Sequence, residues 1–312
     1  MPHVIFIHGL SNKPESDYLH NLWKRKLAQG DGLDLDVNNV ETSMVYWADV
    51  LYPSPDTDLA SYEAETSGSE AIQSGVAIAE IDRYVLSAEE KILMAPLRKK
   101  LQIPDDVEIE KLSEKETLDI ELERVPVPGW LRDKIMEKFV RDAYLYFYNR
   151  EFTPRPGETF KVRDELRKRF LAAVGNVPDS ERPLVVVSHS MGTIIAYDCI
   201  MHESGCAKID GLMTTGSPLG IDEVQDFFPN WTRENGFPSA KLDGRWINVF
   251  DRLDVVAGAD PELANDYKKQ GIPFVNDIEE ANWGTWRHSI SKYLQGKLLR
   301  NNLAKMLNLQ WP

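Results

Sequence analysis

The spacing of hydrophobic residues along the chain predicts alternating strands and helices. Residues 4–7 form an uninterrupted apolar run rich in β-branched side chains, typical of a strand covered on both faces in a parallel sheet. Apolar residues then recur at helical spacing over 17–28, followed by two nearby glycines, and residues 44–47 form the next apolar run. Strand, helix and strand in this order predict a βαβ unit of an open α/β sheet.

The same alternation returns in the second half of the chain. The expected strands are 184–187, 211–215 and 246–250, with a weaker candidate at 274–275, and the expected helices are 162–174, 193–201 and 289–307. Together with the first βαβ unit, these elements predict one α/β domain with a mostly parallel, doubly wound sheet. Residues 1–52 and 151–312 would be its two parts.

The segment between these parts, residues 53–150, is far longer than one crossover helix requires, and we expect it to be a helical cap insertion. Helical patterns cover about 70–94 and 131–148, and the intervening 105–124 carries nine acidic and three basic residues, as a solvated stretch would. The aromatic side chains of the second helix either pack the cap on the core or form a substrate wall. Phe139 and Phe147 are its candidates for substrate binding.

Composition and charge narrow the classes of partner. The chain has 312 residues, 42% hydrophobic and 28% charged, with a net charge of −14 that repels nucleic acid and anionic lipid surfaces. No apolar run approaches the length of a membrane span, and the N-terminus has no secretory leader pattern. The two cysteines, Cys199 and Cys206, indicate neither a disulfide framework nor a metal motif. We therefore expect a cytoplasmic protein with no nucleic-acid partner and no transmembrane segment.

The strongest chemical signal is a serine between a buried strand and a helix. Ser188, Ser190 and Gly192 follow the apolar run in the pattern S-x-S-x-G, and this strand, turn and helix context is the one that a nucleophile elbow requires. Small residues are needed on both sides of the serine because the tight turn brings two backbone segments close together. Ser190 is therefore the candidate nucleophile.

A serine hydroxyl needs a base to remove its proton, and the chain offers six histidines. His189 is adjacent to the serine, and we expect its side chain to point elsewhere. We expect His8, at the end of the first strand, to shape the following loop. His288 lies in a loop beyond the main strands and before the last helix, at the sheet edge where open α/β folds place their sites, so it is the candidate base.

Two carboxylates just past the strand at 246–250 could orient the histidine. Asp251 ends the strand, whereas Asp254 lies in the following turn and precedes two valines that could anchor the loop. We favour Asp254 as the acid of a triad and expect Asp251 to fix the loop by accepting backbone N–H groups, while the alternative assignment stays open.

The order serine, aspartate, histidine resembles that of serine esterases and lipases of the α/β-hydrolase superfamily. The similarity covers about 1–50 and 155–312, including His8-Gly9 after the first strand and Gly-Ser-Pro-Leu at 216–219. The resemblance implies an oxyanion hole made by the backbone N–H groups of Leu10 and Met191. It also suggests that Leu219 lies in the substrate site.

These features predict a serine hydrolase that cleaves a carboxylic ester, with an apolar or lipid-like acyl group, through an acyl-enzyme. Such chemistry requires no metal or organic cofactor. A thioesterase or an acyltransferase could use the same three residues. From a different class, a non-catalytic interaction protein could use the acidic insertion to bind a partner. The sequence leaves the acyl chain, the alcohol and the oligomeric state open.

Overall fold

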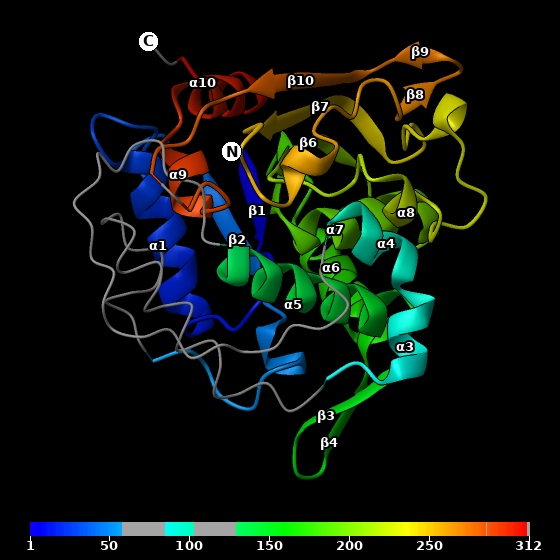
Figure 1. Ribbon diagram of the computed structural model, residues 1–312. Helices are drawn as coiled ribbons and strands as arrows, with labels where there is room; N and C mark the ends of the chain where they lie inside the picture. The colour runs from blue at the N-terminus through cyan, green and yellow to red at the C-terminus, as the bar shows by residue number, and fades with distance from the viewer. Residues whose placement is uncertain (58–84, 103–128, 285, 311–312) are drawn as a thin grey trace.

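A computed structural model describes residues 1–57, 85–102, 129–284 and 286–310. Within these residues, a six-stranded sheet has the order β10-β7-β6-β5-β1-β2, and every neighbouring pair is parallel (Figure 1). The strands are β1 (His3–Ile7), β2 (Glu41–Val45), β5 (Leu184–His189), β6 (Ile209–Thr215), β7 (Leu242–Phe250) and β10 (Val275–Glu279). The α/β fold class expected from the sequence is confirmed by this sheet.

Helices lie on both faces of the sheet. The main ones are α1 (Ser16–Ala28), α6 (Val162–Gly175), α7 (Met191–His202), α9 (Ile290–Gln295) and α10 (Lys297–Met306). Shorter elements are α8 (Asp222–Gln225), the 3₁₀ turns Ala48–Val50, Arg233–Asn235 and Ala257–Ala259, and two hairpins formed by β3 (Glu151–Arg155) with β4 (Glu158–Lys161) and β8 (Lys268–Lys269) with β9 (Ile272–Pro273).

Alternate residues of each strand enter two separate hydrophobic cores. In β1, Val4 and Phe6 pack with α1, α9 and α10, whereas Ile5 and Ile7 pack on the face covered by α6 and α7. The inner strands β1 and β5 are buried on both sides because successive side chains point to opposite faces of a sheet. This explains why these two strands appear in the sequence as continuous apolar runs, whereas the edge strands β2 and β10 are only partly buried.

Three helices of the expected insertion are described. α3 (Ala88–Leu93) and α4 (Ala95–Lys100) form its middle part, and α5 (Gly129–Phe147) packs beside α6 and α7 (Figure 1). The helix expected at 131–148 is thus confirmed. Most of the helix expected at about 70–94, and the whole acidic stretch at 105–124, lie outside the described residues. The domain boundaries at 53 and 150 stay a prediction.

Two expected elements have different limits. The strand expected at 44–47 is β2, which ends at Val45, paired with Ile7. The closing helix expected at 289–307 is broken at Gly296, which has an extended backbone. The carboxylate of Glu280 accepts the Leu298 and Leu299 N–H groups at 2.7 and 2.8 Å and so begins a second helix.

Candidate active site

Ser190 occupies a strained turn between β5 and α7. Its φ of 52° and ψ of −127° lie outside the regions that residues with a side chain usually adopt. The Ser190 N–H donates to the Thr215 carbonyl of the neighbouring strand at 3.0 Å, which holds the turn in register with β6. Ser188, two residues earlier, is fully buried and donates its hydroxyl to Met213 O at 3.1 Å. A serine therefore fits where a glycine is commoner.

Two glycines let the loop after β1 approach this turn. A Cβ on Gly192 would lie 2.5 Å from the His8 carbonyl oxygen, and one on Gly9 would lie 2.6 Å from the Ser190 Cβ. Both separations are shorter than atoms can tolerate, so only glycine allows this packing. The loop that begins at His8 is consequently placed directly against the serine.

His288 accepts the serine hydroxyl. Its Nε2 lies 2.8 Å from Ser190 Oγ, and its Nδ1 lies 2.8 and 2.9 Å from the two carboxylate oxygens of Asp254. With Nδ1–H donating to the carboxylate, Nε2 is left as the acceptor for the hydroxyl. All three side chains are at least 96% buried. The structure therefore brings together the three residues expected from the sequence.

Asp254 accepts hydrogen bonds from further donors besides His288. Its Oδ1 accepts the Val256 N–H at 2.8 Å and the Ala257 N–H at 3.2 Å, and its Oδ2 accepts the Tyr293 hydroxyl at 2.8 Å. Burial acts to raise the pKa of Asp254, but the imidazole of His288 and these donors outweigh it and hold the pKa below its ordinary value. The carboxylate is thus ionised and fixed in orientation.

Asp251 fixes both loops that carry the acid and the histidine. Its Oδ1 accepts the Leu253 N–H at 2.7 Å, and its Oδ2 accepts the Asn282 N–H at 2.6 Å and an Arg287 N–H at 3.0 Å. It makes these contacts from the end of β7. Asp251 therefore has the loop-fixing contacts expected of it, whereas Asp254 is the carboxylate at the imidazole.

Two residues outside the triad support it. The side chain of His189 points away from the serine, as expected, but its contact with His288 and the role of Tyr293 were not expected from the sequence. His189 does not bond Ser190; its Nε2 instead donates to the His288 carbonyl at 3.0 Å, with the two rings 4.7 Å apart. Burial, followed by the neighbouring His288, lowers the pKa of His189 well below its ordinary value. Tyr293 on α9 links Asp254 to the Asp251 N–H. Both act across separations in sequence that no local pattern reveals.

The expected oxyanion donors flank the serine. Met191 is the first residue of α7, where a backbone N–H has no partner within its own helix, and Leu10 follows the glycine that contacts Ser190. Among the described residues, neither N–H donates to a backbone carbonyl in a turn or loop. Two such donors can stabilise an anion that forms at a carbonyl attacked by Ser190.

The expected substrate residues lie in packed surroundings. Leu219 and Phe139 are fully buried in the core on the α6 and α7 face. The Leu219 carbonyl accepts the Tyr267 hydroxyl at 2.7 Å. Phe147 stacks on Phe227 with ring centroids 4.2 Å apart. Their role in binding substrate stays a prediction.

A buried serine, imidazole and carboxylate in hydrogen-bonded series can activate the serine as a nucleophile. Within residues 1–57, 85–102, 129–284 and 286–310, no cluster of three or more potential metal ligands occurs. In the same part of the chain, none of the helices has the length and apolar character needed to cross a bilayer.

Comparisons with known proteins give only distant similarities. No protein-family model and no curated protein matches the sequence. Among solved structures, the chain is similar to a dienelactone hydrolase from Anabaena variabilis, with a TM-score of 0.31 and 10% identity over 95% of this chain and 82% of that one. It is also similar to acetyl xylan esterase 1 from Thermoanaerobacterium, with a TM-score of 0.35 and 13% identity over 100% and 75% of the two chains.

A protein of uncharacterised function from Pseudomonas aeruginosa is similar at a TM-score of 0.29 and 10% identity, over 90% of this chain and 40% of that one. Similarities with TM-scores this low carry no argument about activity. The α/β architecture rests instead on the parallel sheet of this chain, and the serine turn lies between β5 and α7 of that sheet.

Proposed function

We propose that the protein is a serine hydrolase that cleaves carboxylic esters with an apolar acyl group. The observation that carries the proposal is the continuous series of hydrogen bonds from Ser190 Oγ through His288 to Asp254. Each donor and acceptor in that series has the chemistry that nucleophilic acyl transfer needs.

In the proposed reaction, Ser190 Oγ attacks the ester carbonyl while His288 Nε2 takes its proton. The oxyanion accepts hydrogen bonds from the Leu10 and Met191 N–H groups. Collapse of the tetrahedral intermediate breaks the bond to the alcohol, which leaves with the proton from Nε2. Water then attacks the acyl-enzyme with the same assistance and releases the carboxylic acid. Asp254 holds the imidazole and stabilises its charged form throughout.

The apolar acyl preference is proposed from the residues that carry the two expected donors. Leu10 and Met191 both have apolar side chains, which belong to the hydrophobic core on the α6 and α7 face of the sheet. A series of p-nitrophenyl esters of increasing chain length would measure this preference. Matching thioesters would test whether the same residues favour a thioester.

The nucleophile can be tested by covalent labelling with a fluorophosphonate. We expect stoichiometric labelling of the wild type and none of Ser190→Ala, because the reagent traps an activated hydroxyl beside oxyanion donors. Ser188→Ala is the matched control, since it removes a buried serine hydroxyl from the same strand end. It should label like the wild type. Labelling of Ser190→Ala at the wild-type level would overturn Ser190 as the nucleophile, because the reagent would then react at another residue. A wild type that is not labelled would favour a non-catalytic role.

A further inference from the structure

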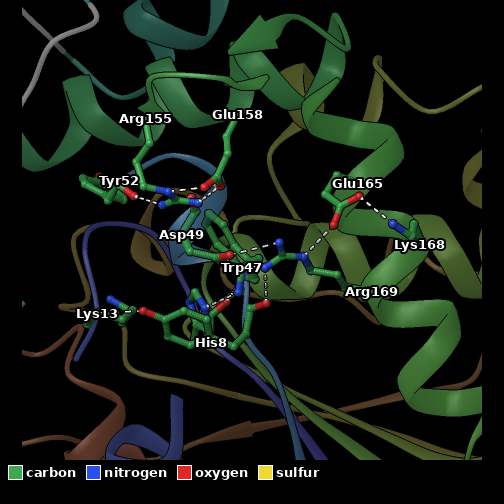
Figure 2. A network of polar contacts seen from close by, with 11 residues as sticks. His8, Lys13, Trp47, Asp49, Tyr52, Arg155, Glu158, Glu165, Lys168 and Arg169 are labelled. Carbon is green, nitrogen blue, oxygen red and sulfur yellow. Dashed lines mark hydrogen bonds and ion pairs between the residues drawn. The ribbon is translucent and has the colours of Figure 1, made fainter. Parts of the chain in front are cut away.

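His8 is a fully buried histidine whose two ring nitrogens both have partners. Its Nδ1 lies 2.8 Å from the Gly9 carbonyl oxygen, and its Nε2 lies 2.9 Å from the backbone nitrogen of Trp47. Figure 2 shows the ring beside Trp47, in a network of polar contacts that also includes Asp49 and Arg169. The reaction outlined above does not use this side chain.

The partners fix which nitrogen carries the proton. The Trp47 N–H can only donate, so Nε2 of His8 must be the acceptor and the proton resides on Nδ1. Nδ1–H therefore donates to the Gly9 carbonyl. Burial, followed by the charge of Lys13, lowers the pKa of His8 well below its ordinary value, so the ring stays neutral in this tautomer.

The Gly9 carbonyl and the Leu10 N–H belong to one planar peptide group. A donor that holds the carbonyl oxygen therefore also sets the direction of the N–H on the opposite side of the plane. A hydrogen bond to the oxygen also polarises the group, which strengthens the N–H as a donor. We propose that His8 is a positioning residue, which orients and polarises the Gly9–Leu10 peptide so that its N–H meets the oxyanion formed at Ser190. This inference rests on the proposed ester hydrolysis.

Trp47 holds His8 from two further directions. Its indole Nε1–H donates to the His8 carbonyl at 2.9 Å, and its ring stacks on the imidazole with centroids 4.7 Å apart and planes 16° from parallel. The loop beyond is held separately, because Lys13 Nζ donates to the Leu10 carbonyl at 2.6 Å. These contacts fix a turn in which Ser11 has a positive φ of 70°.

Trp47 is itself placed by the segment that follows β2. Arg169 on α6 donates to the Tyr46 carbonyl at 3.0 Å and pairs with the carboxylate of Asp49 (Figure 2). The Leu10 N–H is thus connected through His8 and Trp47 to the point where the chain leaves the sheet toward the insertion. In this series, His8 is the residue whose side chain bonds the Gly9–Leu10 peptide group directly.

Variants of His8 separate positioning from packing. His8→Phe keeps a ring against Trp47 but has no donor at Nδ1, whereas the amide nitrogen of His8→Asn can occupy the place of Nδ1. His3→Phe is the matched control, because His3 is a buried histidine at the other end of β1 with both ring nitrogens engaged, by Glu181 and Ser43. The measurements are kcat and KM with p-nitrophenyl butyrate and the inhibition constant of butylboronic acid, which forms a tetrahedral adduct on an active serine.

We expect His8→Phe to lower kcat by about 10- to 100-fold with KM changed by less than about threefold, because complete loss of an oxyanion donor costs about 10²–10³. Inhibition by butylboronic acid should weaken in parallel, since the adduct resembles the transition state. His8→Asn should recover most of the loss, and His3→Phe should keep the wild-type kcat even if its melting temperature falls. If His8→Phe does not fold, His8→Gln is used in its place. A glutamine amide extends toward the Nε2 position and so leaves the Nδ1 position without a donor.

The outcomes distinguish the inference from the function on which it rests. An active wild type combined with a wild-type kcat in folded His8→Phe or His8→Gln overturns the inference alone. Equal losses in the His8 and His3 variants also overturn it, since that pattern reports general destabilisation. A wild type that neither reacts with a fluorophosphonate nor cleaves the ester overturns the proposed function itself.

Discussion

At the scale of single residues, the two aspartates after β7 have separate tasks that their partners define. Asp254 bonds His288 through both carboxylate oxygens, and Tyr293 and two backbone N–H groups complete its surroundings. Asp251 makes no contact with the imidazole and instead joins the two loops through Asn282 and Arg287. We therefore expect Asp254, which bonds the histidine, to control kcat, and Asp251 to control the stability of the fold.

Asp254→Asn should leave the fold nearly intact and lower kcat by about 10⁴, because the imidazole loses its fixed tautomer and the charge that supports its protonated form. Asp251→Asn is the matched control, with a much smaller loss of kcat and a lower melting temperature, since its new amide group would face donors. Steady-state kinetics and thermal unfolding of both variants make the comparison. The reverse ranking in kcat would transfer the triad role to Asp251.

The positions of the three triad residues could be predicted from the sequence, whereas the contacts of their neighbours could not. Ser190 could be predicted because its strand, turn and helix context is contiguous, and His288 and Asp254 because each follows a strand in an ordered series. The contacts of His189 and Tyr293 with those residues could not be predicted, because each depends on how two loops meet in space.

At the scale of elements, α5 is attached to the core away from the serine. The Tyr146 hydroxyl donates to Asp198 on α7 at 2.5 Å, and Phe147 stacks on Phe227. Asp198 is eight residues beyond Ser190, which corresponds to about 12 Å along a helix. The C-terminal end of α5 therefore contacts the middle of α7 and the segment after α8, and its aromatic contacts there are those of core packing.

Phe147→Ala should therefore lower the free energy of unfolding by about 3–5 kcal/mol and leave the relative rates on short and long p-nitrophenyl esters unchanged. Phe139→Ala is the companion variant, from a residue two turns earlier on the same helix. Chemical denaturation and the ester series measure the two effects separately. A changed chain-length preference in Phe147→Ala would instead make this end of α5 part of the acyl pocket.

Element limits were predictable where they depend on local pattern. The inner strands β1 and β5 appear as apolar runs because they are buried on both faces, and α6 and α7 have the expected positions. The break between α9 and α10 was not predictable, because it requires Glu280 to accept the first N–H groups of α10 from a distant segment. The β3–β4 hairpin was also missed, since its strands have little buried apolar surface.

At the scale of the whole molecule, the carboxyl ends of β1 and β5, in the sheet that separates the two hydrophobic cores, hold two neutral histidines. His8 and His189 are both buried, and burial is the largest cause that lowers the pKa of each. In the unfolded chain each imidazole would take up a proton as the pH falls through about 6.5, whereas the native rings would not. The unfolded state thus binds more protons than the native state below this pH, and the free energy of unfolding must decrease as the pH falls.

The free energy of unfolding should therefore decrease between pH 7.5 and 5.5, by at most about 1.4 kcal/mol per pH unit for each histidine that stays neutral in the native state. Urea denaturation at the two pH values measures the difference. His189→Gln, which keeps a donor near Nε2, should reduce it. Equal stability of the wild type at both pH values would contradict this account of the buried rings.

The glycines that allow the close approaches at the serine also give a pattern by which related chains can be recognised. Gly9 and Gly192 face Ser190 and the His8 carbonyl. Gly216 has a positive φ of 53°, and a Cβ at this position would lie 3.0 Å from Asp254 Oδ2 and 3.2 Å from the His288 ring. These glycines follow β1, β5 and β6, so the first and the last of them are more than two hundred residues apart in the sequence. A chain that keeps this site should retain glycine at each of the three places even where overall identity is negligible, so the three positions can be used to search for remote relatives.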